Sequence, residues 1–278
     1  MADTHWSLDD IPWDRFDPGK LDADLIKLVK AASMVESNGG DYAIYLCNVF
    51  ADDAEFQVAA RAWAAEEVQH GEALARWAGM ADPSFDFSAS FKRFTEGYAL
   101  PLGATASVRG SRAGELVARC IVEVGTSSYY SALAAASEEP VLKTICRRIA
   151  ADEFRHYKLF YKHLKRYLEI EKVSKLRRIR IALGRIGESE DDELAYAYYA
   201  ANGTASEPYE RKRWSRAFSA RALAHFRPAH VERGIAMTFK AAGLAPRGPL
   251  ARLTSRGAYW LMRSRQRRAE ALSGAGAP

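Results

Sequence analysis

The chain of 278 residues contains 48% hydrophobic and 27% charged residues, the ordinary balance of a globular protein with an ample core. Its formal net charge is +5, and no stretch has the roughly 18 consecutive apolar residues of a membrane-spanning helix. The opening residues lack the basic start and apolar run of a signal peptide. These features argue against disorder, against export by a standard signal and against a membrane-spanning protein.

Cysteine usage points to a reducing compartment. Cys47, Cys120 and Cys146 are far apart, odd in number and free of any C-x-x-C spacing. Such a pattern is typical neither of a disulfide framework nor of a structural zinc site. We therefore expect a cytoplasmic protein.

Helical periodicity dominates the sequence. Apolar residues recur at three- and four-residue intervals, whereas the alternating pattern of strands is scarce. An all-α fold is predicted. The turn at Pro18 and Gly19 predicts a first helix that starts near Leu21 and runs to about Phe50.

Three further long helices are predicted. The second covers about 53–80 and ends at the ADPSF turn, after which a looser connector runs through ALPLGATASVRG. The third covers about 111–137. The fourth covers about 140–172 and begins at a proline, which favours the first position of a helix.

Three parts of the chain are expected to differ. Residues 1–20 form an N-terminal segment, and residues 20–172 form a four-helix bundle. Residues 173–278 are rich in arginine and alanine and should form shorter helices packed on the bundle. The expected breaks in this last part are at Gly187, Gly203, Pro228, Gly243 and Pro249.

Basic clusters in the last part, KLRRIRIALGR and RSRQRR, predict an acidic partner. Nucleic acid is not the expected partner, because the sequence has neither zinc-finger spacing nor an aromatic RNA-binding strand motif. The segment RGAYWLMRSRQRR fits partner docking, a solvated amphipathic helix or a membrane-surface element equally well.

A Glu-x-x-His motif occurs twice, as Glu67 with His70 and as Glu153 with His156. Residues three positions apart on a helix share a face, so each pair can offer two ligands to one centre. Both pairs fall in otherwise apolar stripes that should face the bundle core. Burying an ionised carboxylate costs several kcal/mol unless the group is paired or binds a metal.

The other two long helices each add one glutamate to a buried stripe. Glu36 lies in the first helix and Glu123 in the apolar run CIVEVG of the third. A single buried glutamate is most often salt-bridged, and a single core histidine is most often hydrogen bonded to the backbone. Together, however, the six residues match the inward-facing ligands of ferritin-like di-iron or di-manganese carboxylate proteins. Oxygen and nitrogen ligands without thiolate suit iron or manganese better than a structural zinc site. We expect iron rather than manganese, because iron can activate oxygen.

Residues next to these ligands have a predicted supporting role. Glu66 and Asp152 directly precede the ligand glutamates and could accept hydrogen bonds from the imidazoles. Surface acidity explains them equally well. His163 shares the inner face of the fourth helix, but no partner spacing supports it as a ligand, so a core role is predicted.

The motifs resemble those of the soluble acyl-carrier-protein desaturases of plants and bacteria. AWAAEEVQHGEAL is similar to the family's W-x-A-E-E-x-x-H-G segment, and ICRRIAADEFRHYKLFYKHL is similar to its I-C-x-x-I-A-A-D-E-x-R-H segment. The family's E-x-x-T motif corresponds to Glu123 through Thr126. The resemblance covers about residues 28–172 and leaves the last hundred residues unmatched.

This resemblance implies a ferritin-like bundle that holds two irons and uses dioxygen. Thr126 would lie beside the oxygen-binding face, and Asp152 would link a histidine to the electron path. The substrate would be an acyl chain on the acidic acyl carrier protein, the electron donor a ferredoxin-type protein and the assembly a homodimer. The implied metal ligands are Glu36, Glu67, His70, Glu123, Glu153 and His156.

Two other functions stay open. One is a di-iron hydroxylase or oxygenase that acts on another lipid-like substrate, and the other is a ferritin-like iron-binding protein without an organic substrate. Gly39, Gly40 and Gly125 near the ligands favour an enzyme, because small residues leave room for a ligand channel. Close helix contact would explain these glycines as well.

Overall fold

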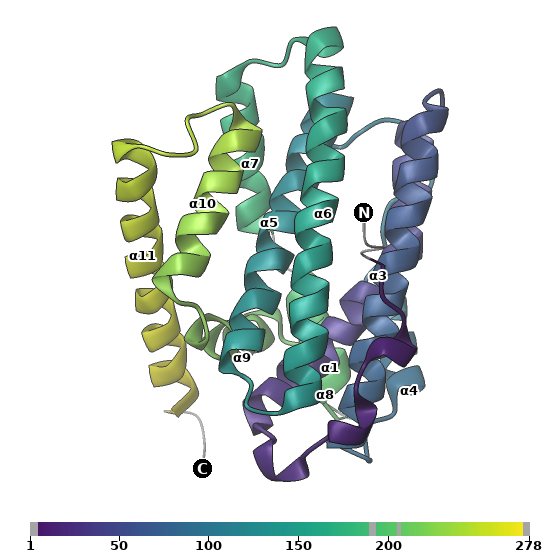
Figure 1. Ribbon diagram of the computed structural model, residues 1–278, viewed down its shortest axis with the longest axis vertical. Helices are drawn as coiled ribbons and strands as arrows, with labels where there is room; N and C mark the ends of the chain where they lie inside the picture. The colour runs from purple at the N-terminus through teal and green to yellow at the C-terminus, as the bar shows by residue number, and fades with distance from the viewer. Residues whose placement is uncertain (1–4, 189–192, 205–206, 275–278) are drawn as a thin grey trace.

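The computed structural model describes residues 5–188, 193–204 and 207–274, and these residues form helices without any strand. The predicted all-α bundle fold is thus confirmed (Figure 1). Three short 3₁₀ turns, Leu8–Asp10, Trp13–Arg15 and Pro18–Lys20, precede the first α-helix. The helices are α1 (Ala23–Ser37), α2 (Gly39–Val49), α3 (Ala54–Ala81), α4 (Phe87–Gly97), α5 (Arg112–Ala136), α6 (Pro140–Glu171), α7 (Lys175–Glu188), α8 (Glu193–Asn202), α9 (Arg211–Ala224), α10 (Pro228–Ala242) and α11 (Pro249–Gly274).

The long helices α3, α5 and α6 agree with the predicted ranges to within a residue or two. Each begins at a side chain that accepts hydrogen bonds from the otherwise unpaired N–H groups of the first turn. The capping residues are Asp53, Ser111 and Glu139. Helices α5 and α6 pack closely along their length, and α3 packs against α1 and α6.

The prediction of one continuous first helix from Leu21 to Phe50 is wrong, because the chain breaks at Asn38 into α1 and α2. Asn38 has φ −84° and ψ 6°, outside the helical region. Close packing against α3 accompanies this break. A Cβ atom at Gly39 would lie 2.6 Å from the Cβ of Glu67, so only glycine permits this approach.

Helix α4 was not predicted, since its residues fell in the expected connector after α3. Asp86 caps its start by accepting a hydrogen bond from the N–H of Ala89. Phe87, Phe91 and Phe94 follow one another at helical spacing, and Phe94 is fully buried. The helical periodicity of this segment is present but short. The phenylalanines pack the helix against the bundle.

The C-terminal helices pack on the outside of the bundle. Helix α8 lies against α1, and α7 and α10 lie against α5. The prediction of shorter helices in this part is wrong for α11, which has 26 residues. It packs mainly against α9 and α10 and forms the outer left side of the molecule in Figure 1.

Two apolar clusters fill the core at different heights. One includes Leu28, Trp77 and Ile145, and the other includes Leu116 and Phe160. Along α3 and α6, the polar residues predicted as metal ligands lie between these two clusters, and on α5 Glu123 lies near the end of the second cluster. The core therefore encloses a polar layer. Within the described ranges, no helix has the length and apolarity needed to cross a membrane.

Candidate metal centre

The structure brings all six predicted ligand residues together in the polar layer. Glu36 comes from α1, Glu67 and His70 from α3, Glu123 from α5, and Glu153 and His156 from α6. Every one of these side chains is buried, with at most 6% of its residue surface exposed. Four helices thus place four carboxyl groups and two imidazoles in one water-excluded layer.

These residues form two overlapping groups. One group contains Glu36, Glu67, His70 and Glu153, and the other contains Glu67, Glu123, Glu153 and His156. Within each group the ligand atoms all lie within 4.8 Å of one another. Glu67 and Glu153 belong to both groups, which is the position that a carboxylate bridging two ions would occupy.

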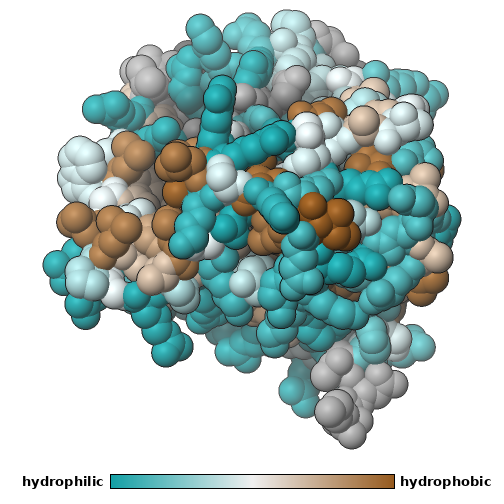
Figure 2. Space-filling model, turned by 90° about the horizontal axis from the view of Figure 1, so that it is seen from above, coloured by the Kyte–Doolittle hydropathy of each residue, from teal (hydrophilic) through white to brown (hydrophobic). Residues whose placement is uncertain are grey.

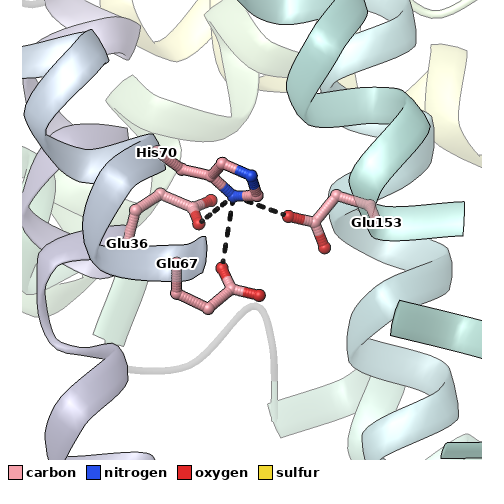
Figure 3. Close-up of side chains that lie close together, drawn as sticks. All are labelled: Glu36, Glu67, His70 and Glu153. Atoms are coloured by element: carbon pink, nitrogen blue, oxygen red, sulfur yellow. Dashed lines mark ion pairs between the residues drawn. The ribbon is translucent and has the colours of Figure 1, made fainter. Parts of the chain in front are cut away.

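Figure 3 shows the first group around the Nδ1 atom of His70. This nitrogen lies 3.6 Å from Glu36 Oε2, 3.6 Å from Glu67 Oε2 and 3.4 Å from Glu153 Oε1. In the second group, His156 Nδ1 lies 3.0 Å from Glu67 Oε1 and 3.8 Å from oxygens of Glu123 and Glu153.

The outer nitrogen of each imidazole is held by the acid that precedes the other helix's ligand glutamate. His70 Nε2 on α3 lies 2.9 Å from Asp152 Oδ2 on α6, and His156 Nε2 on α6 lies 2.9 Å from Glu66 Oε2 on α3. The two hydrogen bonds therefore cross between the helices. They turn both Nδ1 atoms toward the carboxylates, and such outer partners orient metal-binding histidines in general.

Several inward atoms have no hydrogen-bond partner among the described residues, although buried polar atoms usually have one. They are His70 Nδ1, His156 Nδ1, Glu123 Oε2 and Glu153 Oε1. All four belong to the two overlapping groups, and nitrogen and carboxylate oxygen are good ligands for iron or manganese. The residues present therefore fit a pair of metal ions.

Hydroxyl groups hold two of the carboxylates in place. Thr126 Oγ1 donates a hydrogen bond of 2.6 Å to Glu153 Oε2, and Tyr130 Oη donates one to Glu36 Oε1. Sequence reasoning selected Thr126 through a motif. Tyr130 is a further residue of α5 that contacts a proposed ligand.

Asp152 connects the cluster to the N-terminal segment. The indole of Trp6 donates a hydrogen bond of 2.6 Å to Asp152 Oδ2, and its ring stacks parallel to that of His70 at 5.9 Å. Arg155 pairs with the other oxygen of Asp152, and Arg148 lies over the Trp6 ring. Sequence reasoning missed Trp6, since a tryptophan 146 positions away from its partner gives no local signal.

A small cavity of about 50 Å³ adjoins the cluster. Its wall includes apolar side chains such as Val35 and Trp63 and also Arg119, a buried cation that sequence reasoning missed. The Arg119 guanidinium lies 3.5 Å from Glu123 Oε1 and 4.8 Å from the centre of the Trp63 ring. Its Nε atom finds no hydrogen-bond partner in the part of the chain that the structure describes. Tyr42 and Glu193 also line the cavity, and Tyr42 Oη donates a hydrogen bond of 2.7 Å to Glu193.

Charges in the cluster shift one another's protonation. Burial raises the pKa of Glu36 well above its usual range, and the Glu67 carboxylate raises it further. Burial also raises the pKa of Glu123, with the Glu153 charge adding to the effect. Burial opposes charge on His70, but its carboxylate partners outweigh burial and raise its pKa. Burial and mutual repulsion therefore oppose a full set of negative charges in this layer.

Four other residues singled out in the sequence lie outside the two ligand groups. His163 is buried but belongs to neither group, and its Nδ1 accepts a hydrogen bond of 3.0 Å from Arg166. Of the three glycines, Gly39 makes a close contact with α3 and lines the cavity, whereas Gly40 and Gly125 border open space.

The fold and the cluster together define an all-helical protein with a buried carboxylate–histidine layer able to hold metal ions. Residues 46–183, just under half of the chain, match the family model described as fatty acid desaturase. This range includes α3, α5 and α6 and five of the six clustered residues, with Glu36 outside it. No curated protein matches the chain. The match supports a fatty acid desaturase family for this chain, and such a family implies an oxidoreductase of lipid metabolism.

Proposed function

We propose that the protein is an oxygen-dependent di-iron oxidoreductase that desaturates a fatty acyl chain bound to acyl carrier protein. The observation that carries the proposal is the pair of overlapping ligand groups with Glu67 and Glu153 in common. The family match supports the fatty acyl substrate, and the sequence resemblance supports the carrier.

In this proposal Glu36, His70, Glu67 and Glu153 would hold one ion, and Glu123, His156, Glu67 and Glu153 would hold the other. Each histidine would offer Nδ1, because its Nε2 atom is already hydrogen bonded. Bound iron would supply the redox chemistry for reducing dioxygen and removing hydrogen from an unactivated carbon. In the overall reaction, dioxygen takes up two electrons, two protons and two hydrogens from the acyl chain, and the products are two waters and one alkene.

The chain's own residues exclude water and fix the geometry. Two apolar clusters enclose the layer, so that water has little access to reactive species. Thr126 orients Glu153 by its hydrogen bond, and its side chain lines the cavity in which a substrate carbon would approach. We assign Asp152 to electron entry, because it joins His70 to the Trp6 indole.

The cavity has room for only one or two water molecules, far below the roughly 300–1,000 Å³ of typical ligand sites. An acyl chain can therefore enter only if side chains that line the cavity move. Tyr42, Glu193 and Arg119 are among these side chains. We propose that substrate binding displaces them.

A ferredoxin-type protein is the proposed electron donor and a homodimer is the proposed assembly, both by the resemblance described above. Neither proposal is needed for the metal assignment.

The first experiment is iron loading without oxygen, followed by metal analysis and Mössbauer spectroscopy. Two coupled irons per chain are expected, and Glu67→Ala and Glu153→Ala should lose them. Glu72→Ala is the matched control, because Glu72 is exposed on the same helix as Glu67. Absence of stoichiometric iron in the unaltered protein would refute the metal centre and with it the desaturase.

The second experiment tests the reaction. Loaded protein receives oxygen, a reductant chain and acyl carrier proteins with acyl chains of several lengths, and products are analysed by mass spectrometry. A loss of two hydrogens supports desaturation. A mass gain from labelled dioxygen would instead identify a hydroxylase, and bound iron without any change in substrate would indicate an iron-binding protein.

A further inference from the structure

Helix α11 exposes four large apolar residues to solvent, while small or polar residues occupy its buried positions. The buried positions are Ala251, Ser255, Gln266 and Ala269. The exposed large residues form what we call the outer stripe: Leu250, Leu253, Trp260 and Leu261, which are 61%, 69%, 67% and 47% exposed. An amphipathic helix on a globular protein normally does the reverse, with its apolar face toward the core.

The outer stripe is a continuous feature of one face. Its members are spaced by three, seven and one residues, which places them within about a third of the helix circumference at 3.6 residues per turn. Buried Ser255 and Gln266 lie on the opposite side, where α9 and α10 pack. Among the residues that the structure describes, no element covers the outer stripe, whose four side chains stay exposed.

Positive charge accompanies the stripe. Helix α11 contains six arginines and one glutamate, a net charge of +5 that equals the net charge of the whole chain. Arg252, Arg256 and Arg267 are exposed beside the stripe. In Figure 2, brown apolar surface gathers on the left, the side on which α11 lies in Figure 1, and teal hydrophilic side chains border it.

We propose that the outer stripe of α11 docks on an anionic lipid surface. Exposed leucine and tryptophan with flanking arginines are the composition of a helix that lies in the plane of a membrane interface. The arginines complement anionic headgroups, while the stripe reaches the boundary of the acyl chains. No membrane-spanning helix is required.

Charge also argues against a second copy of the chain as the occupant. Pairing two α11 helices would bring two net charges of +5 together, and like charges repel across an interface. An acidic lipid surface meets both requirements of this face at once, since it accepts positive charge and apolar side chains. The proposal does not rest on the metal centre or on the desaturase reaction.

Co-sedimentation with vesicles tests the proposal on the full chain. The protein should bind vesicles of phosphatidylcholine with phosphatidylglycerol and should not bind vesicles of phosphatidylcholine alone. Added salt should weaken binding. Arg252→Gln with Arg256→Gln should lower the partition coefficient roughly 25-fold, at about fivefold per arginine near an anionic surface.

A stripe variant, Leu253→Ser with Trp260→Ser, should lower partitioning by at least about tenfold. The matched control is Leu176→Ser with Leu183→Ser on α7, where both leucines are also exposed, at 81% and 64%. Far-ultraviolet circular dichroism checks that each variant folds. Brominated lipids should quench a fluorescence component that is absent in Trp260→Phe.

Several results would overturn the proposal. They are failure to bind anionic vesicles at low salt, full binding by the stripe variant, and an equal loss in the α7 control. If the protein ignores vesicles and the stripe variant changes from dimer to monomer, the face is an interface between copies. If it ignores vesicles and both α11 variants lose binding to acidic acyl carrier protein, the face docks a protein instead.

Discussion

Replacing Gly71 by alanine should both destabilise the protein and weaken metal binding. Gly71 lies on α3 directly opposite the end of α1, and an added Cβ would lie 2.7 Å from the backbone N and 2.9 Å from the Cα of Ser37. Backbone atoms cannot rotate away, so α1 must shift. Because Glu36 immediately precedes Ser37, the shift moves a proposed metal ligand relative to Glu67 and His70.

The expected net cost is about 2 kcal/mol. Overpacking of a well-packed contact costs about 1–3 kcal/mol, and the three contacts closer than 3.0 Å at Gly71 place it at the upper end. Alanine recovers about 1 kcal/mol of helix propensity over glycine. Gly79→Ala on the same helix is the control, because nothing lies within 4 Å of its added Cβ. It should stabilise by up to about 1 kcal/mol.

Urea unfolding of the metal-free proteins measures the stability difference, and iron titration measures the change in binding. Gly71→Ala should unfold at lower urea than the unaltered chain, and its affinity for iron should fall. If Gly71→Ala matches Gly79→Ala in stability and keeps full iron affinity, the close contact between α1 and α3 is not as described.

Three further predictions concern the second histidine, pH and a partly buried ion pair. Glu66→Gln should weaken metal binding by about 10–100-fold, because Glu66 orients His156, and a chelator competition series should show this loss without a change in fold. Metal affinity should fall as pH falls, because burial raises the pKa of Glu36 and protons then compete with the ion. The same chelator competition, repeated at several pH values, measures this dependence, and an affinity that does not change with pH would contradict the reasoning. Asp82→Asn should cost about 1 kcal/mol at neutral pH, because it leaves the Lys30 ammonium without its carboxylate. The hydrogen bond from Lys30 lowers the pKa of Asp82 from 3.8 to about 2, so its stabilising contribution is present above pH 3.8 and is lost as pH falls through 2. Urea unfolding across that pH range should show the stabilities of the variant and the unaltered protein converging.

The sequence by itself determined much of the candidate site. Two Glu-x-x-His motifs on apolar stripes, with one glutamate on each of the other two helices, identified all six clustered residues before any contact was known. This worked because helical spacing decides which side chains share a face. The same periodicity predicted the extents of α3, α5 and α6, where capping residues gave additional local signals.

Only the tertiary structure decided how those faces meet. Two hydrogen bonds of Asp152, to His70 and to Trp6, join residues on different elements. The burial of Arg119 depends on how the surrounding helices pack. The break at Asn38 accompanies close packing against α3, which periodicity within one segment cannot register. For α11, the sequence left several roles open, and only the packing against α9 and α10 decided that the outer stripe faces solvent. Local spacing fixes the direction of a side chain on its own helix, and only the neighbouring helices determine whether that direction is core or solvent.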